Sequence, residues 1–406
     1  MNERIAITGV GVVSPFGDST AQFRDALLGG ETAIARDPKF AAFACRSTLS
    51  ARVRGFEPSK WIAPMKIRRM DTTGPFALVA IRQAIDEAGY TVTADGDPDA
   101  GVVLGTYSAG GQATNEYLEA LFRGGPSGAP ALLFNSTVGN AAAGLAGLEY
   151  KLCGPNATIS QKEASGLAAI VAAVDLLRLG RAAALAAGGM DAIFDIFYRA
   201  HDRFAVMNAS SEPGGATAPF DESRGGFVMG EGAYVLWLQP SGSVTGRIQG
   251  EVLGTGAASA ITGLNAWPRD PEDLARTMQL AIQDAGLSAA AIDVVYASAN
   301  ADPVLDAVEA RALASVFGDA RPVVTSIKGA IGECGACGAA ACLAAVLCGA
   351  SGFVPPIAGL HRTDPAASSL QIATAAVHAP GEIVLVNSVA SGGALCSVVL
   401  RVPRQH

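Results

Sequence analysis

The sequence predicts an α/β fold made of two similar halves that stack in five layers, α-β-α-β-α. Three observations lead to this prediction. A helix followed by an apolar strand occurs twice in the 406 residues, two helical segments are apolar on nearly every face, and half of the chain is hydrophobic while only 16% is charged. A chain of this length and composition can bury two sheets and the helices between them.

The internal duplication is weak, but its parts occur in the same order in each half. Residues 84–89 read Ala-Ile-Asp-Glu-Ala-Gly, and residues 281–286 read Ala-Ile-Gln-Asp-Ala-Gly. In each copy the glycine ends a helical pattern, as a C-terminal cap does. A polar linker then leads to an apolar run, at 101–105 in the first copy and at 292–296 in the second. We therefore expect two halves of similar topology.

The central layer is predicted by two segments, residues 165–179 and 335–348, which consist mostly of small and aliphatic residues. A helix without a polar face is buried on all sides, so both segments should lie between the two sheets. The turn-forming cluster Pro-Ser-Gly-Ser at 240–243 predicts the join between the halves. It divides the chain into an N-terminal half, 1–240, and a C-terminal half, 246–404.

Composition and charge exclude several classes of protein. No uninterrupted run of about 18 apolar residues occurs, which argues against a membrane-spanning helix and a membrane role. The first residues, Met-Asn-Glu-Arg, lack the basic and apolar regions of a signal peptide, and the seven cysteines are scattered as in a reduced interior. These features predict a cytoplasmic location. The net charge of -8 argues against nucleic acid as a partner.

Three motifs carry a family resemblance that extends over essentially the whole chain. Residues 7–15 read Ile-Thr-Gly-Val-Gly-Val-Val-Ser-Pro, and residues 68–71 read Arg-Arg-Met-Asp. Residues 219–233 contain Pro-Phe-Asp, Arg224 and the run Gly-Phe-Val-Met-Gly-Glu-Gly-Ala. In these motifs the chain resembles the β-ketoacyl synthases. The resemblance implies a thiolase-like fold and an obligate dimer.

The catalytic positions of that family are altered in this chain. The resemblance implies a Cys nucleophile at a strand-to-helix elbow and two His residues in the second half, which stabilise enolate and oxyanion charge. In the elbow motif at 158–166, Glu163 stands in the Cys position. Ser298 and Glu333 stand in the two His positions. None of these three catalytic side chains is therefore intact.

Other parts of the family's site are also incomplete. Lys328 is retained, but the resemblance places its Glu partner at Cys342. The Gly-Phe-Gly-Gly loop of the family reads Ala-Ser-Gly-Gly at 390–393, without its gating Phe. The chain has four histidines, none of which lies in a motif of this kind. They are His201, His361, His378 and His406. We therefore expect that this chain does not condense acyl chains by itself.

Glu163 is expected at the N-terminus of a buried helix, where the helix dipole and free N–H groups favour a negative charge. In the active family this place holds the oxyanion hole. We expect the Glu163 carboxylate to occupy the hole, paired with Lys328; the alternative is that it hydrogen-bonds locally or reaches water. Glu333 is a second buried acid. Two carboxylates near one Lys predict that one of them has a raised pKa.

Other chemistry at these residues has less support. A carboxylate and an amine can act as an acid/base pair, but neither a nucleophile nor a histidine accompanies them in the sequence. Cys334 and Cys337 have the spacing of a redox or zinc motif, but they lack a second such pair or a His cluster. The sequence therefore predicts no metal and no cofactor.

A degenerate ketosynthase that keeps the whole fold resembles the chain-length factor of a bacterial type II polyketide synthase. The resemblance implies a non-condensing subunit that forms a heterodimer with an active ketosynthase and meets the acyl carrier protein through that complex. The partner holds the growing chain, and the depth of a tunnel across the interface sets the chain length. Aromatic systems typically have Gln at the nucleophile position, so Glu163 leaves polyene or aryl-polyene pathways open.

The resemblance places tunnel-lining residues on the helix after a Gly-Gly turn and on a facing segment that reaches across the two-fold axis. They are Gln112, Asn115, Tyr117 and Glu119 on the helix, and Leu133 and Phe134 on the facing segment. The helix residues are about one turn apart, so several can point the same way. A polar side chain in an apolar tunnel is costly unless it is paired. A solvated helix surface is therefore the alternative for Gln112 and Glu119.

Two other functions stay open at this point. One is an enzyme, a malonyl-carrier decarboxylase that primes chain synthesis, although such members of the family keep their histidines. The other is a homodimeric scaffold. Purification of the chain alone separates the scaffold from the heterodimer, because a stable homodimer indicates the first and insolubility without a ketosynthase partner indicates the second.

Overall fold

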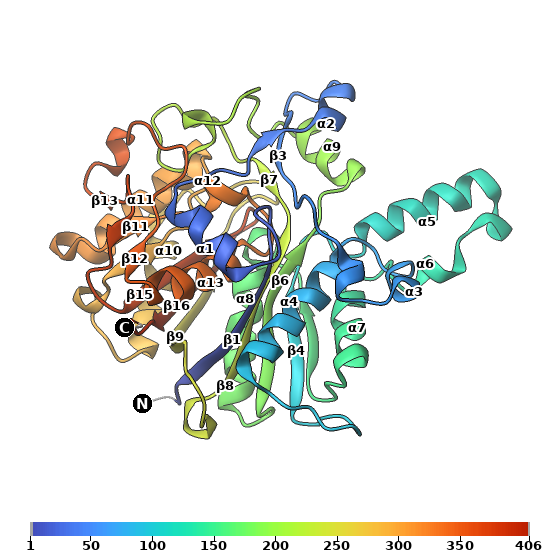
Figure 1. Ribbon diagram of the computed structural model, residues 1–406. Helices are drawn as coiled ribbons and strands as arrows, with labels where there is room; N and C mark the ends of the chain where they lie inside the picture. The colour runs from blue at the N-terminus through green and yellow to red at the C-terminus, as the bar shows by residue number, and fades with distance from the viewer. Residues whose placement is uncertain (1–2, 405–406) are drawn as a thin grey trace.

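The two halves of the chain each build a sheet, and the sheets lie on opposite sides of two central helices (Figure 1). The computed structural model describes residues 3–404. Its strands are β1 (Ile5–Val13), β2 (Ala35–Arg36), β3 (Leu49–Ala51), β4 (Ala100–Gly105), β5 (Asn156–Ile159), β6 (Ala184–Asp191), β7 (Met229–Gly230), β8 (Gly232–Pro240), β9 (Gly250–Ser259), β10 (Val294–Tyr296), β11 (Val323–Thr325), β12 (Phe353–Val354), β13 (Gln371–Ile372), β14 (Val377–His378), β15 (Ile383–Val389) and β16 (Ala394–Arg401).

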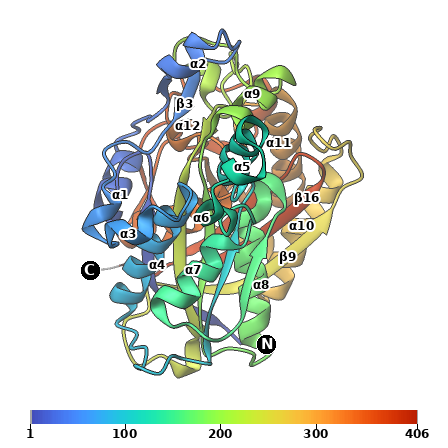
Figure 2. The same ribbon diagram turned by 90° about the vertical axis from the view of Figure 1, so that its right-hand side faces the viewer.

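The helices come from both halves and cover both sheets. They are α1 (Thr20–Leu28), α2 (Pro38–Ala42), α3 (Pro64–Ile67), α4 (Thr73–Ala88), α5 (Gly111–Gly124), α6 (Ala131–Phe134), α7 (Ala141–Tyr150), α8 (Ser165–Arg178), α9 (Asp195–Arg203), α10 (Pro271–Asp284), α11 (Pro303–Phe317), α12 (Lys328–Ile331) and α13 (Cys337–Ala350). In Figure 2, α4 and α7 lie on one side of α8, and α10 lies on the other.

One hydrogen-bonded ladder of eleven strands runs through both halves, in the order β13-β11-β10-β15-β16-β9-β1-β8-β6-β4-β5. The halves meet where β1 pairs antiparallel with β9 over three residues, with Ile5 opposite Val252 and Ile7 opposite Gly250. The thiolase-like, five-layer arrangement predicted from the sequence is confirmed. The short ladder that joins the two sheets was not predicted.

The central layer consists of α8 and α13, as predicted. Helix α8 contacts β4 and β6 of the N-terminal sheet and β9 and β16 of the C-terminal sheet, while α13 contacts α8, β8 and β15. Most of their side chains are buried, although Asp175 of α8 is exposed. Helix α13 begins at Cys337, two residues later than predicted, and the N–H of Gly335 before it donates a hydrogen bond to Asp191.

The duplicated glycines act as predicted. Gly89 follows α4 with a φ of 60°, and Gly286 follows α10 with a φ of 69°. Both are left-handed conformations that glycine adopts at low cost, and they end the helices. In the C-terminal half, α10 and α11 begin with an Asp N-cap followed by Pro, at Asp270 and Asp302. These caps satisfy free N–H groups and fix where the helices start.

Glycines also let the two central helices meet the ends of the strands. A Cβ on Gly105, at the end of β4, would lie 2.0 Å from the carbonyl oxygen of Ser165, the first residue of α8. A Cβ on Gly166 would lie 3.1 Å from the Cα of Ala336, just before α13. The N-termini of α8 and α13 are therefore packed backbone to backbone, which brings the two halves' elbows together.

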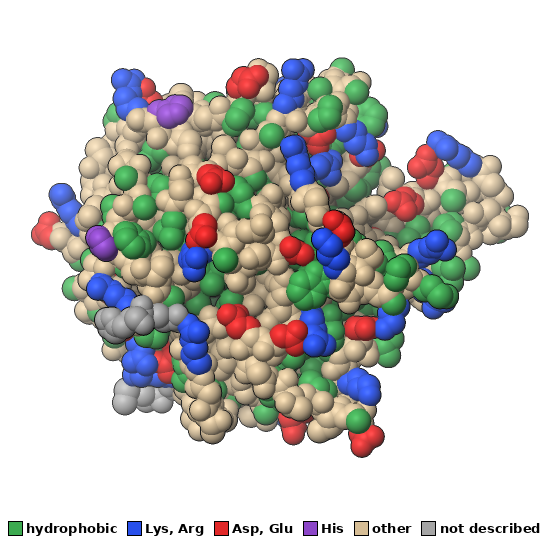
Figure 3. Space-filling view, viewed as in Figure 1, with side chains coloured by type: hydrophobic (Ala, Val, Ile, Leu, Met, Phe, Trp, Pro, Cys, Tyr) green, Lys and Arg blue, Asp and Glu red, His purple; other side chains and the backbone are tan. Residues whose placement is uncertain are grey.

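An arm formed by α5 and α6 projects from the body (Figures 1 and 2). It carries large apolar side chains that are open to solvent, among them Phe122 (81% exposed) and Leu132 (65% exposed). Hydrophobic side chains are visible on the arm in Figure 3. Among residues 3–404, no helix combines the length and apolar character needed to cross a membrane. All seven cysteines are free thiols.

Candidate functional site

The altered catalytic positions converge where α8 and α13 begin. Glu163 lies one short turn before α8, and Glu333 lies shortly before α13. Lys328 is the first residue of α12, and Ser298 follows β10. All four side chains are buried. The structure thus brings together residues that are far apart in the sequence: Glu163 and Glu333 line one cavity, and Lys328 contacts both Glu333 and Ser298.

Glu163 is held by the loop between β15 and β16 and not by a cation. The backbone N–H of Ser391 donates to its Oε2 at 2.9 Å, and the Ser391 hydroxyl lies 3.0 Å from Oε1. Burial raises the pKa of Glu163 to about 7, and the negative charge of Glu333 adds to the rise. Hydrogen bonds from the backbone of Glu163 itself and from Ser391 oppose it. Glu163 is therefore a buried acid that titrates near neutrality.

Lys328 pairs with Glu333, so the expected pair between Lys328 and Glu163 was wrong. The ammonium Nζ lies 2.7 Å from Glu333 Oε2 and also donates to the carbonyl of Ser298 at 2.7 Å and to its hydroxyl at 3.1 Å. Burial lowers the pKa of Lys328, but the surrounding charges and hydrogen bonds, led by Glu333, together outweigh burial and the net pKa is raised. Gly332, with a φ of 73°, turns the chain so that Glu333 faces back toward the lysine.

Further polar groups complete the Lys328 cluster. The amide of Asn300 donates to Glu333 Oε2 at 2.8 Å. Glu309, a buried residue of α11, accepts hydrogen bonds from the Ser298 N–H at 2.9 Å and from the Asn387 amide at 3.0 Å. Burial raises the pKa of Glu309, and its hydrogen bonds and the charge of Lys328 oppose the rise. Glu309 was not predicted from the sequence, although it lies eleven residues after Ser298 on the helix that follows that motif.

Two small cavities adjoin Glu163. One has a volume of about 60 Å³ and the other, smaller one about 20 Å³. The first is lined by Tyr107, Glu163, His201, Phe204, Val206, Phe227, Asn265, Trp267 and Ser391. The second also reaches Asp191, Glu333 and Cys334. Spaces of this size hold a few water molecules and no long ligand.

His201 lines both cavities, so the expectation that no histidine accompanies the acids was wrong. It comes from α9, and its Nδ1 lies 2.8 Å from the carbonyl oxygen of Phe197, which can only accept. Nδ1 therefore carries the proton, and Nε2 accepts from the hydroxyl of Tyr107 at 3.1 Å. Burial lowers the pKa of His201, which favours the neutral ring. His361 and His378 do not line the cavities, and His406 lies outside the described residues.

Asp191 ties the pocket to both halves and was also missed from the sequence. Its Oδ1 accepts from the hydroxyl of Thr106, the N–H of Tyr107 and both the N–H and hydroxyl of Ser108, all within 2.8 Å. Its Oδ2 accepts from the N–H of Gly335 in the second half. Burial raises the pKa of Asp191 and these hydrogen bonds oppose the rise.

The Cys334 and Cys337 thiols lie side by side, with 3.5 Å between their sulfur atoms. The Cys337 thiol donates to the carbonyl of Gly332 at 3.3 Å. The hydrogen bond to Cys337 and burial raise the pKa of Cys334, which makes its thiol a poor nucleophile. Among the described residues, no group of three or more His, Cys, Asp or Glu side chains could hold a metal ion.

The residues expected along the tunnel lie on the arm. Gln112 hydrogen-bonds Thr72 and Glu116, and Glu119 forms an ion pair with Arg123 at 2.6 Å. These polar contacts agree with a solvated helix surface for both residues. The ring of Tyr117 lies 5.6 Å from that of Phe134. Leu133 is half-buried, while Phe134 is 59% exposed.

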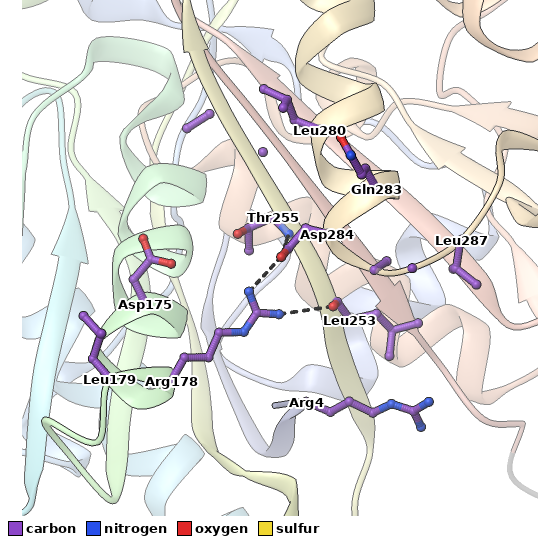
Figure 4. A pocket seen from close by; sticks show the side chains of 14 residues that line it. Arg4, Asp175, Arg178, Leu179, Leu253, Thr255, Leu280, Gln283, Asp284 and Leu287 are labelled. Atoms are coloured by element: carbon purple, nitrogen blue, oxygen red, sulfur yellow. Dashed lines mark hydrogen bonds and ion pairs between the residues drawn. The ribbon is translucent and has the colours of Figure 1, made fainter. Parts of the chain in front are cut away.

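A much larger hollow, of about 900 Å³, lies at the opposite end of α8 (Figure 4). At 1.5 Å per residue it is about 20 Å from Glu163 along the helix. Arg178 crosses it, contacting Asp284 at 2.7 Å and the carbonyl of Leu253 at 3.1 Å. The contacts of Arg178 in this hollow connect α8 to the C-terminal half. None of Glu163, Ser298 and Glu333 lines the hollow.

Comparison with known proteins connects this pocket to one family. Residues 2–242 match the family profile "Beta-ketoacyl synthase, N-terminal domain", and residues 249–361 match "Beta-ketoacyl synthase, C-terminal domain". The chain is 29% identical to "3-oxoacyl-[acyl-carrier-protein] synthase 2" of Coxiella burnetii over 407 residues, 98% of each chain. It is 33% identical to "Putative polyketide beta-ketoacyl synthase 1" of Streptomyces halstedii over 384 residues, 90% of each.

Solved structures agree with the sequence relatives. A structure described as "The ishigamide ketosynthase/chain length factor" matches with a TM-score of 0.91 and 27% identity, over 99% of this chain and 100% of that one. A β-ketoacyl synthase from Burkholderia phymatum STM815 matches with the same score, identity and coverage. With both family profiles matched over most of its length and the same fold throughout, this chain belongs to the beta-ketoacyl synthase family.

Proposed function

We propose that this chain is the non-condensing, chain-length-factor subunit of a type II polyketide ketosynthase pair. The observation that carries the proposal is the content of the pocket. Where condensation needs a thiol and two imidazoles, the proposed positions hold Glu163, Ser298 and Glu333, and all three are fixed by hydrogen bonds. The relatives named as synthases show the family, but their chemistry requires a nucleophile that this elbow lacks.

No other group in the pocket replaces the nucleophile. Cys334 is the cysteine that lines the smaller cavity, of about 20 Å³, and its raised pKa keeps it a thiol. The Tyr107 hydroxyl donates to His201, and burial raises the pKa of Tyr107 well above its usual value. The chain therefore needs a partner subunit to hold a covalent acyl intermediate.

Glu163 fills the place that would otherwise receive developing negative charge. The N–H groups of Ser391 and of Glu163 itself both reach its carboxyl group. Two converging backbone N–H groups are the usual form of an oxyanion hole, and here an internal carboxyl occupies them. With about 60 Å³ and 20 Å³ left beside it, the pocket has no room for a growing acyl chain.

The arm and an edge strand supply a surface for a partner. Strand β5 ends the eleven-strand ladder with one side unpaired, and it lies beside α7. The arm exposes Phe122, Leu132 and Phe134. An unpaired edge and large exposed apolar side chains are features of an obligate interface. A ketosynthase of the same fold offers a matching edge, and the ishigamide protein is named as a ketosynthase with a chain length factor.

Reconstitution tests the proposal. The chain is incubated with an active ketosynthase from its own gene neighbourhood, an acyl carrier protein and malonyl groups, and each subunit is also assayed alone. We expect polyketide only with both subunits, and an acyl adduct, detected by mass spectrometry, only on the ketosynthase cysteine. An acyl adduct on the isolated chain would contradict the proposal, and malonyl-carrier decarboxylation by the chain alone would indicate the priming enzyme instead.

Chain length provides a second test on the same complex. Asn115→Trp and Phe134→Trp should shorten the product, because both residues lie on the arm segments proposed to line the tunnel. Glu119→Gln serves as the matched control. Its carboxylate pairs with Arg123 on the exposed helix surface, so product length should not change. If both Trp variants gave products of unchanged length, the arm would not line the tunnel.

A further inference from the structure

Lys162 and Glu163 are neighbours in the elbow, and both side chains contact the hydroxyl of Ser391. Glu163 is buried, while Lys162 is half-buried and has a φ of 50°. A left-handed conformation costs a residue with a side chain about 1–2 kcal/mol. Contacts of the Lys162 side chain offset this cost, and they concentrate on the two segments that lie over the cavity.

The ammonium of Lys162 joins these two segments. It donates to the carbonyl of Leu264 and, at 2.9 Å, to Oδ1 of Asn265, both in the segment between β9 and α10. It also lies 3.3 Å from the hydroxyl of Ser391, in the loop between β15 and β16. Ser391 in turn bonds Glu163. A continuous polar chain therefore runs from the surface, through Ser391, to the buried acid.

The same two segments already touch through their backbones. The N–H of Gly392 donates to the carbonyl of Ala266 at 3.0 Å, and the N–H of Ala260 donates to the carbonyl of Gly393 at 2.8 Å. Side chains of both segments, Asn265 and Ser391, line the cavity of about 60 Å³. The smaller cavity shares Glu163 and His201 with it and also reaches Cys334. If the two segments separate, the first cavity opens, and we expect Cys334 in the adjoining cavity to become more accessible.

We propose that Lys162 is a latch that holds the 264–265 segment and the Ser391 loop closed over the pocket, and so excludes molecules larger than water. The arrangement joins three separate parts of the chain through one ammonium group. In the heterodimer, and here the inference rests on the proposed function, a closed latch keeps the acyl carrier's arm out of this subunit's pocket and leaves it to the ketosynthase. The closure itself is a property of this chain alone.

Alkylation of Cys334 measures the closure directly. The full-length chain is treated with iodoacetamide, and the rate at each cysteine is followed by peptide mass spectrometry. Cys153 is exposed and serves as the reference for reagent activity. Cys342, buried within α13, reports loss of the fold. The raised pKa of Cys334 slows its reaction in every variant, so the ratio between variants is the readout.

Lys162→Met removes the ammonium and keeps the length of the side chain. We expect the Cys334 rate to rise about tenfold, which corresponds to about 1.4 kcal/mol lost from closure, with Cys342 still protected. The matched control is Lys151→Met, which removes another surface ammonium from a residue with a φ of 54° that donates to Ala94 and does not line either cavity. It should leave the Cys334 rate unchanged.

Asn265→Ala provides a second variant that does not alter the elbow. It removes one acceptor of Lys162, and we expect a smaller increase in the Cys334 rate, again with Cys342 protected. An unchanged Cys334 rate in both variants, or equal increases at Cys334 and Cys342, would overturn the latch. Neither result depends on a ketosynthase or on product length, so failure here is distinct from failure of the proposed function.

Discussion

Glu163 and Glu333 are both buried in one pocket, but only Glu333 has a cation. Glu333 lies 2.7 Å from the ammonium of Lys328. Glu163 is held only by the N–H and hydroxyl of Ser391 and by its own backbone, and its pKa is raised to about 7. Burial raises the pKa of both acids. The charge and hydrogen bond of Lys328 oppose the rise at Glu333, whereas the hydrogen bonds that oppose it at Glu163 come from neutral groups.

The difference shows how a pocket with two buried acids can stay folded. A buried lysine without a counter-ion is costly, and Glu333 supplies the counter-ion. The N–H and hydroxyl of Ser391 need only a hydrogen-bond acceptor, and the carboxyl group of Glu163 can accept from them whether it is protonated or ionised. The two acids therefore have separate structural tasks, and the free energy of unfolding should respond differently to the loss of each.

The largest effect should follow Glu333→Ala. This change leaves the Lys328 ammonium buried without its ion pair, and we expect the free energy of unfolding to fall by about 3–5 kcal/mol, measured by urea denaturation. The double variant Glu333→Ala with Lys328→Met is the control, because it removes both charges and should recover part of the loss. A loss below about 1 kcal/mol would show that the pair is not the main support of Lys328.

Glu163→Gln should have an effect of opposite sign that depends on pH. The folded pKa of Glu163 is about 7 against an ordinary value of 4.5, so the folded state holds the proton more tightly than the unfolded state. Stability from this group is present below pH 4.5 and is lost as pH rises to about 7. The amide keeps the acceptor for Ser391 but removes the charge. We therefore expect the variant to match the native chain near pH 4.5.

Above pH 7 the same variant should be more stable than the native chain by about 3 kcal/mol, the free energy equivalent of the pKa difference. Urea denaturation at pH 5 and pH 8 measures the change. A constant difference between the two proteins across this range would mean that Glu163 keeps its ordinary pKa. Glu163→Asp is a useful control, because it keeps the charge and should keep the pH dependence.

The sequence predicted the fold well for reasons that are local or carried by motifs. Helix α8 was placed correctly because most of its positions are apolar and its charged residues, Asp175 and Arg178, lie in its last turn. The elbow and both altered His positions were assigned because each lies in a short motif. The three-residue ladder between β1 and β9 was not predicted, since pairing over so few residues leaves no periodic pattern.

The contacts inside the pocket were harder to predict. The choice of Glu333 over Glu163 as the partner of Lys328 depends on the turn at Gly332 and on side-chain directions. The one available signal was the five-residue separation with a glycine before the acid. His201 enters the pocket because α9 packs over it, and nothing near His201 in the sequence marks this position. Such contacts depend on tertiary packing and not on local pattern.

The smallest effects should come from ion pairs outside the pocket, which test whether burial decides the cost. The Arg178–Asp284 pair at the far end of α8 is partly exposed, with side chains 13% and 20% accessible, against 5% and 2% for Lys328 and Glu333. We expect Arg178→Met to cost about 1 kcal/mol and the difference to shrink in high salt, because solvent and ions screen the pair. The exposed Arg82–Asp86 pair is the control, and Arg82→Met should cost less. If Arg178→Met costs as much as Glu333→Ala, burial does not distinguish the two pairs, and the contrast between Glu163 and Glu333 loses its physical basis.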